Sequence, residues 1–377
     1  MKIVHIIIGL NVGGAELMLK RLALSQLNDG IYDITVISLT SLGKVGQQLN
    51  DKGIQVKYLG MKSFFHLATG FIRLFKILSQ KRPCIVQTWM YHADLIGGVA
   101  AKLAGCSKII WGIRNTDTFY GRGLSRSTAV LLKACAVLSS IIPHTIVCVA
   151  REGKKAHIVK GYKRKKMMVI GNGFDTKKFK SKKNIRHKIR DELGIKNNHI
   201  VVGSIGRYNE YKDHKNFIQS AGKVALKDEN ALFLLVGQGV SLENKFLSKW
   251  IEDTGFSDRF ILLGERSDIP SILNAVDIFC LHSISEGFPN VLGEAMSVGL
   301  PSVVTDVGDA GLLMGDAGLL VPPRDSKALS RSVNKLIQQP EKRLLLGTTA
   351  RKRIKKNFSI SIIKNQYDEL YKRVLST

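Results

Sequence analysis

The sequence of 377 residues is short of cysteine and of acidic side chains. Its five cysteines form neither a Cys-x-x-Cys pair nor a cluster with metal-ligand spacing, so we expect reduced core thiols, a cytoplasmic compartment and no bound zinc. The 30 Asp and Glu residues stand against 57 Lys and Arg residues, which leaves a net charge of +27. Such a surface attracts nucleic acid, anionic lipid or acidic small molecules.

The sequence also lacks an apolar run long enough to span a bilayer. Residues 1–9 carry one lysine before a short apolar run without a small-residue cleavage site, which predicts a first β-strand rather than a signal peptide. The apolar stretch 128–143 contains Lys133 and ends at Pro143, below the ~20 residues of a spanning helix. We therefore expect a core or interfacial helix there.

Signals for nucleic acid are missing as well. No recognised binding motif occurs, and no aromatic residues alternate with the basic clusters, so we expect no nucleic-acid partner. Basic residues crowd the stretch 154–190, which is interpreted most simply as solvated surface.

What the sequence contains is a repeated alternation of short apolar strands and helical patterns, typical of parallel sheets with helices on both faces. Its length and its hydrophobic content of 45% predict about two domains. We predict two Rossmann-like, doubly wound α/β domains facing each other across a cleft: residues 1–172 and 173–358, with a last helix in 359–377 packing back on the first domain. The predicted strands are 2–8, 33–39, 55–59, 85–88, 108–113, 145–149, 167–170, 199–205, 231–236, 259–263, 277–281, 302–305 and 318–321.

Two features of the first half follow predicted strands. Gly13 and Gly14 stand between the first strand and the first helix, where backbone and helix N-terminus can approach a phosphate. The pattern is not Gly-x-Gly-x-x-Gly, and a plain turn is the alternative. His92 follows the fourth strand at the edge where open sheets bind ligands, and it could donate to a sugar hydroxyl or carry a proton. A purely structural histidine is the alternative.

The second half places charges at corresponding positions. Arg207 and Lys212 put two fixed cations after a strand, as a diphosphate requires. Glu286 is predicted on a loop, and Glu294 in the early turns of a helix over 290–298, with Gly299 ending it. The helix N-terminus suits an anion, and the carboxylates can accept bonds from sugar or ribose hydroxyls. Alternatively, both are ordinary loop and early-helix charges.

The stretch 63–82 repeats apolar residues at helical spacing and carries four cations on or near the predicted helix. Such a helix is either an outer layer of its domain or a segment that lies on an anionic membrane surface. The overall charge of +27 favours the membrane.

The run 285–296, with Gly299-Leu300-Pro301 and Val321-Pro322-Pro323, resembles the glutamate-x7-glutamate signature of the group 1 (family 4) retaining glycosyltransferases. Other segments resemble further motifs of this family in the same order, so the similarity covers nearly the whole chain: Gly13 to Glu16, Asn172 to Asp175, and Gly206-Arg207 with Lys212. The family has the GT-B fold and needs no metal. This sequence has no Asp-x-Asp triplet that would hold one.

The resemblance implies a role for each matching residue. Arg207 and Lys212 would bind the donor diphosphate and neutralise the leaving group, while Glu286 would hold the donor sugar and Glu294 the ribose. His92 corresponds to the active-site histidine, although relatives often carry a histidine two or three positions earlier. The catalytic set is therefore His92, Glu286, Arg207 and Lys212. The implied donor site, including a phosphate cradle at Gly14 and 288–292 and a base loop at 264–266, consists of Gly13, Gly14, Asn172, Arg207, Lys212, Gly264, Arg266, Glu286, Phe288, Asn290, Val291, Leu292 and Glu294.

The implied activity is transfer of a hexose or N-acetylhexosamine from a nucleotide diphosphate sugar, with UDP as the expected nucleotide, and with retention of configuration. Residues 1–172 would bind the acceptor and 173–358 the donor, without cofactor or metal. With the basic surface, the resemblance suggests a lipid-linked saccharide acceptor, peripheral contact with the inner face of a bacterial cytoplasmic membrane, and a role in surface polysaccharide synthesis. A nucleotide-sugar epimerase on the same fold and a non-enzymatic basic binding protein are the alternatives.

Overall fold

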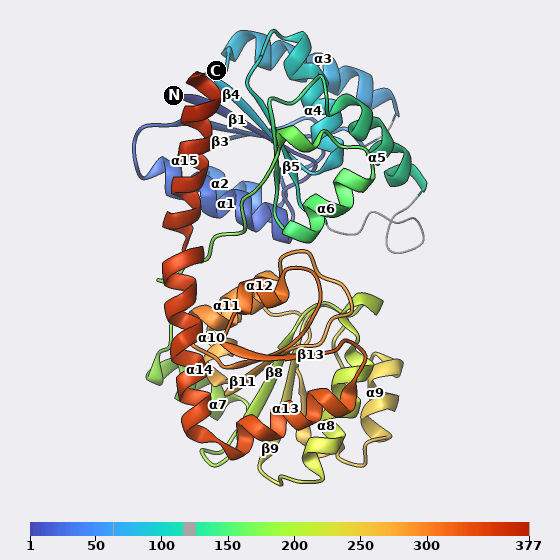
Figure 1. The fold of residues 1–377 in the computed structure, drawn as a ribbon, viewed down its shortest axis with the longest axis vertical. Coiled ribbons are helices and arrows are strands. Elements are labelled where there is room, and N and C mark those ends of the chain that lie inside the picture. The colour runs from blue at the N-terminus through green and yellow to red at the C-terminus, as the bar shows by residue number, and fades with distance from the viewer. Residues whose placement is uncertain (63, 116–125, 377) are drawn as a thin grey trace. The chain divides into compact units, whose positions relative to one another are not determined.

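The computed structural model describes residues 1–62, 64–115 and 126–376 and divides the chain into two compact units (Figure 1). Unit 1 consists of Met1–Gly173 together with Ile360–Thr377, and unit 2 of Phe174–Ser359. Each unit is a parallel sheet with helices on both faces (Figure 1). The predicted pair of doubly wound α/β domains is therefore confirmed.

The described elements of unit 1 are β1 (Lys2–Ile7), α1 (Gly14–Leu27), β2 (Asp33–Ser38), α2 (Gly43–Asn50), β3 (Gln55–Tyr58), α3 (Phe64–Lys81), β4 (Ile85–Trp89), α4 (Tyr91–Leu103), β5 (Ile109–Ile113), α5 (Arg126–Leu138), β6 (Thr145–Cys148), α6 (Arg151–Val159), η1 (Arg164–Lys166), β7 (Met167–Val169) and α15 (Ile360–Ser376). Those of unit 2 are α7 (Lys183–Glu192), β8 (Ile200–Ile205), η2 (Glu210–Lys212), α8 (His214–Ala225), β9 (Ala231–Val236), α9 (Lys245–Glu252), η3 (Ser257–Arg259), β10 (Phe260–Leu262), α10 (Ile269–Ala275), β11 (Ile278–Leu281), α11 (Asn290–Val298), β12 (Ser302–Thr305), α12 (Ala310–Met314), β13 (Gly318–Val321), α13 (Ser326–Gln338), α14 (Pro340–Arg353) and the π-helical turn η4 (Ile354–Phe358). Every predicted strand is present, and each of its ends lies within one residue of the predicted end.

Strand order shows where a ligand can bind. In unit 1 the order is β3-β2-β1-β4-β5-β6-β7, and in unit 2 it is β10-β9-β8-β11-β12-β13. The order reverses between β1 and β4 in the first sheet and between β8 and β11 in the second. Open α/β sheets bind ligands beyond the carboxyl ends of the strands at such a switch point. The predicted residues Gly13, His92, Arg207 and Glu286 follow these four strands.

Side chains along each strand point alternately to the two faces of the sheet, and this explains why unit 1 has two hydrophobic cores. In β1, Val4 and Ile6 join a cluster that α3, α4 and α5 cover. Ile3 and Ile7 point to the other face and join a cluster that α1, α2 and α15 cover. Successive strand side chains point to opposite faces, so a strand that is apolar throughout is buried on both.

Helix α15 completes one face of unit 1 (Figure 1). Its Tyr367 and Tyr371 are fully buried, and Tyr371 Oη donates to Gln87 Oε1 of β4 at 2.5 Å. Asp368 accepts a bond of 2.8 Å from Tyr32 Oη and lies 2.7 Å from Lys364 Nζ. Buried aromatic rings and partnered polar groups together hold the last helix on the first sheet.

Two expectations about surface and core fail at individual residues. The five cysteines are free thiols. Cys84, however, is exposed rather than buried in the core, because it lies on the connection before β4. Arg190, at the end of the basic stretch 154–190, is buried rather than solvated. Its Nη2 donates to His199 O at 2.5 Å, and its Nη1 lies 3.6 Å from Asp277 Oδ2, which explains how a buried guanidinium is tolerated.

Among the described helices, none has an apolar stretch of the length that crossing a membrane requires. The apolar stretch 128–143 forms most of α5, and its Leu132, Cys135 and Ala136 are buried in the unit 1 core.

A buried carboxyl group joins α4 to the sheet below His92. Asp94 Oδ1 accepts a bond of 2.5 Å from Thr88 Oγ1 and one of 3.2 Å from the Gly112 N–H. Burial raises the pKa of Asp94 to about 7. The hydrogen bonds from Thr88 and Gly112 lower this pKa, but their effect is smaller than that of burial. The folded protein therefore holds this proton more tightly than the unfolded chain, and the corresponding stability is lost as pH rises from about 4 to about 7.

Replacing Asp94 with Asn should remove this pH dependence, because the amide oxygen can still accept both bonds. Between about pH 5 and about pH 8, the parent chain should lose about 3 kcal/mol more of its free energy of unfolding than D94N does, measured by urea titration. The exposed residue Asp33 provides the control D33N, which should behave as the parent. Equal pH dependence in D94N and parent would contradict the assignment.

Candidate active site

The turn after β8 is tightly constrained in unit 2. The Gly206 N–H donates to Val236 O at 2.8 Å, and the Tyr208 N–H donates to Gln238 O at 2.8 Å. Gly237 packs so closely that a Cβ there would lie 2.1 Å from Gly206 O. The segment 236–238 thus holds the backbone on both sides of Arg207. A charge that stabilises a leaving group has to be positioned in this way before the reaction.

Lys212 and Glu286 are paired. Lys212 Nζ lies 2.5 Å from Glu286 Oε1, which also accepts a bond of 2.7 Å from Ser283 Oγ. The two side chains are only 21% and 14% exposed. The Ile284 N–H donates to Tyr211 O at 2.8 Å and joins the two loops that carry the pair. The sequence predicts both residues for the donor site, and the structure brings them into direct contact.

Arg207 differs from Lys212 because its guanidinium has no carboxylate partner within the described residues. Its side chain is exposed, and it makes no hydrogen bond or ion pair within the described ranges of the chain. A guanidinium with five free donors beside the Gly206 turn can bind oxygens of a diphosphate in a forked geometry.

Helix α11 begins beside Glu286. Pro289 is its N-cap and makes no side-chain cap bond, so the N–H groups of Val291 and Leu292, which lie in the first turn, can bind an anion. Gly299, at φ 96°, ends the helix as predicted. Phe288, at 8% exposure, stacks on Phe174 with ring centroids 6.3 Å apart. Glu294 lies in the second turn of α11 and is 8% exposed.

The loop before α12 supports the backbone of Glu286. Gly308 has φ +54°, and a Cβ there would lie 2.0 Å from Glu286 O and 2.9 Å from Gly287 O. The Asp309 N–H also donates to Gly287 O at 3.0 Å. Only glycine combines this backbone angle with so close an approach.

The two predicted residues of the base loop differ. Gly264 O accepts a bond of 2.8 Å from the Gly237 N–H, which places Gly264 next to the turn of Gly206. Arg266 forms a forked pair with Asp268, with bonds of 2.8 and 2.9 Å, and also contacts Glu192. These hydrogen bonds and carboxylates raise the pKa of Arg266. The Arg266 guanidinium is thus engaged by neighbouring carboxylates, and its contact with a base stays a prediction.

Two buried histidines under the loop of Lys212 were not predicted as functional. His282 Nε2 lies 2.6 Å from Ser204 Oγ, and the rings of His214 and His282 meet edge to face at 5.4 Å. Burial lowers the pKa of His282 well below its usual value and that of His214 to about 4. Neutral rings therefore fill the space below Lys212. Their positions in the sequence could have identified them, because His214 is the first residue of α8 and His282 directly follows β11.

In unit 1 the glycine turn is occupied by a carboxylate. Gly13 is the extended N-cap of α1, and a Cβ on it would lie 2.4 Å from Glu16 Oε2. Burial raises the pKa of Glu16, and a hydrogen bond to its own backbone lowers it. Gly14 is the first residue of α1. The turn therefore has the predicted helix N-terminus, with the Glu16 carboxylate beside it.

His92 and Asn172 lie at the same edge of the first sheet. His92 is the second residue of α4, half-buried, and burial lowers its pKa. Met90, two residues before His92, has φ 72°, a backbone conformation that is uncommon for residues other than glycine. Asn172 Oδ1 accepts a bond of 3.0 Å from Nη1 of Arg114, the residue that follows β5, so this predicted donor residue is held at the carboxyl end of β5.

Within the described residues, no group of three or more His, Cys, Asp or Glu side chains is arranged to hold a metal ion. In unit 2, the described side chains offer fixed positive charge next to a carboxylate and near a helix N-terminus.

The chain matches two family models. Residues 12–178 match "Glycosyltransferase Family 4", and residues 185–353 match "Glycosyl transferases group 1". Together the two models account for most of both units.

Several characterised proteins are similar over most of the chain. A UDP-Gal:alpha-D-GlcNAc-diphosphoundecaprenol alpha-1,3-galactosyltransferase of Escherichia coli is 28% identical over 310 residues, covering 80% of this chain and 78% of that protein. An N,N'-diacetylbacillosaminyl-diphospho-undecaprenol alpha-1,3-N-acetylgalactosaminyltransferase of Campylobacter jejuni is 29% identical over 357 residues, covering 87% and 88%. The capsular polysaccharide biosynthesis glycosyltransferase CapM of Staphylococcus aureus is 26% identical, covering 81% and 80%.

Solved structures share the fold. Anabaena HepE in complex with UDP and glucose has a TM-score of 0.87 at 24% identity, covering 99% of this chain and 100% of that chain. WaaG, a glycosyltransferase involved in lipopolysaccharide biosynthesis, has a TM-score of 0.73 at 16% identity, covering 97% and 98%. The predicted GT-B fold is thereby confirmed.

Replacing Gly308 with Ala should lower the free energy of unfolding by about 2 kcal/mol or more, because the added Cβ meets backbone atoms at a positive φ. Gly311→Ala is the matched control: its Cβ would meet no atom closer than 3.5 Å, so its unfolding temperature should stay close to that of the parent. Thermal unfolding of the three proteins measures the difference. If both variants melt alike, the contact of Gly308 with Glu286 is not a constraint.

Proposed function

The chain belongs to the group 1 (family 4) glycosyltransferases, and we propose that it transfers a hexose or N-acetylhexosamine from a UDP-sugar to a saccharide on a polyprenyl diphosphate, with retention of configuration. Relatives named for diphosphoundecaprenol-linked acceptors support the acceptor, and one named for UDP-Gal supports the nucleotide. CapM, which is named for capsular polysaccharide biosynthesis, supports a role in surface polysaccharide synthesis.

The observation that carries this proposal is the pairing of Lys212 with Glu286 between the loops that follow β8 and β11. Arg207 lies on the first of these loops, and α11 begins directly after the second. An acceptor hydroxyl attacks the anomeric carbon, and the bond from that carbon to the β-phosphate oxygen breaks. Arg207, Lys212 and the α11 N–H groups stabilise the charge that develops on the leaving diphosphate. In a front-face reaction, the hydroxyl proton passes to the departing phosphate oxygen, so no protein nucleophile is needed.

The predicted clamps complete the donor site. Glu286, held by Ser283, accepts bonds from hydroxyls of the donor sugar, and Glu294 accepts bonds from the ribose. His92 in unit 1 donates to a hydroxyl of the transferred sugar or of the acceptor. No metal or other cofactor has a role in this reaction.

The ion pair gives this site a specific property. Before the donor arrives, Glu286 compensates the charge of Lys212, whose side chain is only 21% exposed. A diphosphate competes with Glu286 for the ammonium group, since both are anionic acceptors. When Lys212 turns to the phosphate, Glu286 is released to accept sugar hydroxyls.

The proposed acceptor is lipid-linked, so the enzyme works at a membrane. We place it as a peripheral protein on the inner face of the cytoplasmic membrane of a bacterium. The net charge of +27 supports contact with anionic lipid.

The test of this function is a donor screen with the full chain and a short-chain polyprenyl-diphosphate saccharide. UDP-sugars should release UDP only when the acceptor is present, and NMR of the product should show the anomeric configuration of the donor. An epimerase would convert UDP-sugar without acceptor. A binding protein without activity would release no nucleotide from any donor, and either result would reject the proposal.

Replacing Glu286 with Gln should separate binding from catalysis. Transfer should fall by about 100-fold or more, because the sugar loses a charged acceptor. Affinity for UDP should rise severalfold, because the diphosphate no longer competes with a carboxylate for Lys212. Calorimetric titration and a UDP-release assay measure the two effects, and E252Q, an exposed glutamate on α9, is the control. Weaker UDP binding in E286Q would contradict the competition.

A further inference from the structure

Helix α3 presents large apolar side chains to solvent. Its inner face is buried, with Leu74 and Leu78 at 0% exposure. On its outer face, Phe65, Ile72 and Phe75 are 84%, 53% and 37% exposed. Their spacing of seven and three residues places them along one side of the helix. A continuous apolar stripe on a surface helix indicates a contact surface, whereas single exposed apolar residues do not.

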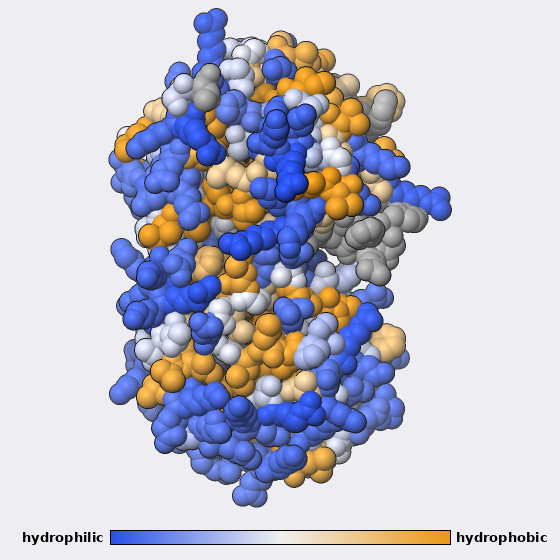
Figure 2. Space-filling view, in the orientation of Figure 1, coloured by the Kyte–Doolittle hydropathy of each residue, from blue (hydrophilic) through white to orange (hydrophobic). Residues whose placement is uncertain are grey.

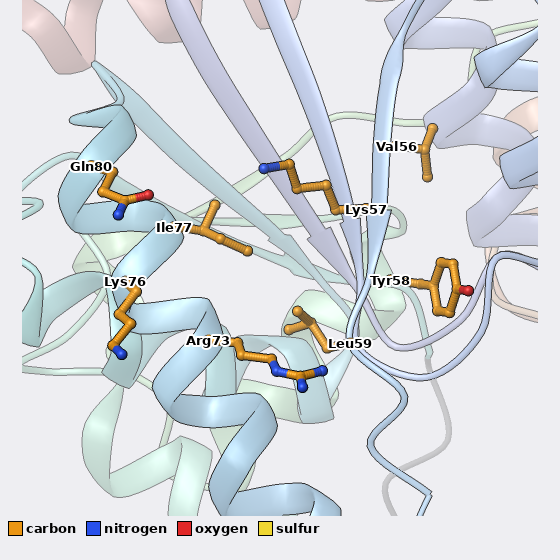
Figure 3. Close-up of a pocket in the computed structure, with 8 residues that line it drawn as sticks. All are labelled: Val56, Lys57, Tyr58, Leu59, Arg73, Lys76, Ile77 and Gln80. Carbon is orange, nitrogen blue, oxygen red and sulfur yellow. The ribbon is translucent and has the colours of Figure 1, made fainter.

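The flank of α3 that faces β3 is cationic. A cavity of about 510 Å³ lies between the two elements and is lined by Val56, Lys57, Tyr58, Leu59, Arg73, Lys76, Ile77 and Gln80 (Figure 3). Three of these residues are basic and none is acidic. Lys57, Arg73 and Lys76 make no ion pair or side-chain hydrogen bond within the parts of the chain that the structure describes. In Figure 3, Lys57 extends from β3 toward the helix, on the side of Ile77 and Gln80.

The flank that faces α4 is apolar. A groove of about 440 Å³ runs between the two helices and is lined only by apolar side chains: Leu67, Ala68, Phe71, Ile72, Leu95, Ile96 and Val99. In Figure 2, hydrophobic side chains gather at the upper right, over α3 and its neighbours. The outer stripe of α3 thus has cations on one side and an apolar groove on the other.

The position of this surface relates it to the sheet edge of unit 1 that carries His92. β3 ends at Tyr58 and α3 begins at Phe64, so the first turn of α3 lies at the carboxyl edge of the sheet. Gly14, the first residue of α1, and His92, the second residue of α4, lie at that same edge. A lipid-linked acceptor that reaches this edge would bring its membrane alongside α3.

We propose that the surface formed by Phe65, Ile72 and Phe75 with Lys57, Arg73 and Lys76 docks this enzyme on an anionic phospholipid bilayer. The three cations bind the phosphates of lipid headgroups, and the apolar stripe enters the interface between headgroups and acyl chains. Complementary charge selects this occupant, because α3 contains no acidic residue and the cavity beside it has none. The inference rests on the proposed function, in which the acceptor is carried by a lipid.

Sedimentation of the full chain with vesicles tests the surface. The chain should bind vesicles that contain phosphatidylglycerol at least about ten-fold more tightly than pure phosphatidylcholine vesicles, and added salt should weaken binding. The variant K57A/R73A/K76A should lose at least about ten-fold in apparent affinity for the anionic vesicles. The matched control K163A/R164A/K165A removes the same charge from exposed residues of unit 1 and should lose no more than about two-fold.

A second pair of variants tests the apolar stripe. F65S/I72S should also lose affinity for anionic vesicles, whereas L103S/V159S, which alters two other exposed apolar residues of unit 1, should not. If K57A/R73A/K76A melts at a lower temperature than the parent, its loss of vesicle binding is not used. The comparison of F65S/I72S with L103S/V159S and the salt dependence of the parent then decide the outcome. Equal losses in both cationic triple variants would mean that net charge alone binds the membrane, and that result would overturn the docking surface.

Failure of this inference is distinguishable from failure of the proposed function. If the parent chain ignores phosphatidylglycerol vesicles at low salt but releases UDP with a water-soluble, short-chain acceptor, the enzyme stands and the docking surface is rejected. If the parent chain binds the vesicles as described but transfers no sugar, the docking surface stands and the proposed function is rejected.

Discussion

The contact between Lys212 and Glu286 is the interaction on which the donor site depends. An ammonium group and a carboxylate, both largely removed from solvent, meet at 2.5 Å between the loops that follow β8 and β11. Each charge would be costly to hold there alone, so each fixes the other. Ser283 holds Glu286 from one side, and the neutral rings of His214 and His282 fill the space below. The pair therefore arranges the site in the absence of a donor.

The surrounding fold places other charges where this pair can use them. Parallel strands end at one edge, and the reversal of strand order between β8 and β11 brings two loops together there. Gly237 and Gly308 let backbone segments approach the turns of Arg207 and Glu286 from either side. The guanidinium of Arg207, which has no ion-pair partner among the described residues, and the N-terminus of α11 then add positive potential beside the pair.

Much of this architecture could be predicted from local sequence. Apolar strands, helix-ending Gly299 and the alternation of elements are short-range signals, and every predicted strand formed. The pairing of Lys212 with Glu286 could not be predicted, because it joins residues 74 positions apart through a loop geometry that only packing determines. The same holds for the burial of Arg190 beside Asp277 and for the contact of Arg266 with Glu192, which is 74 positions away. Whether a charge faces solvent, a ligand or a partner is decided by long-range contacts.

The most direct test of the account is a structure of this chain with UDP bound. Lys212 Nζ and the Arg207 guanidinium should each lie within ~3 Å of diphosphate oxygens, with at least one N–H of the first turn of α11 on the same group. The contact between Lys212 and Glu286 should then be broken, with the Glu286 carboxylate directed to the space that the donor sugar would occupy. A diphosphate bound away from the loop 206–212, with the Lys212–Glu286 pair intact, would contradict the central claim.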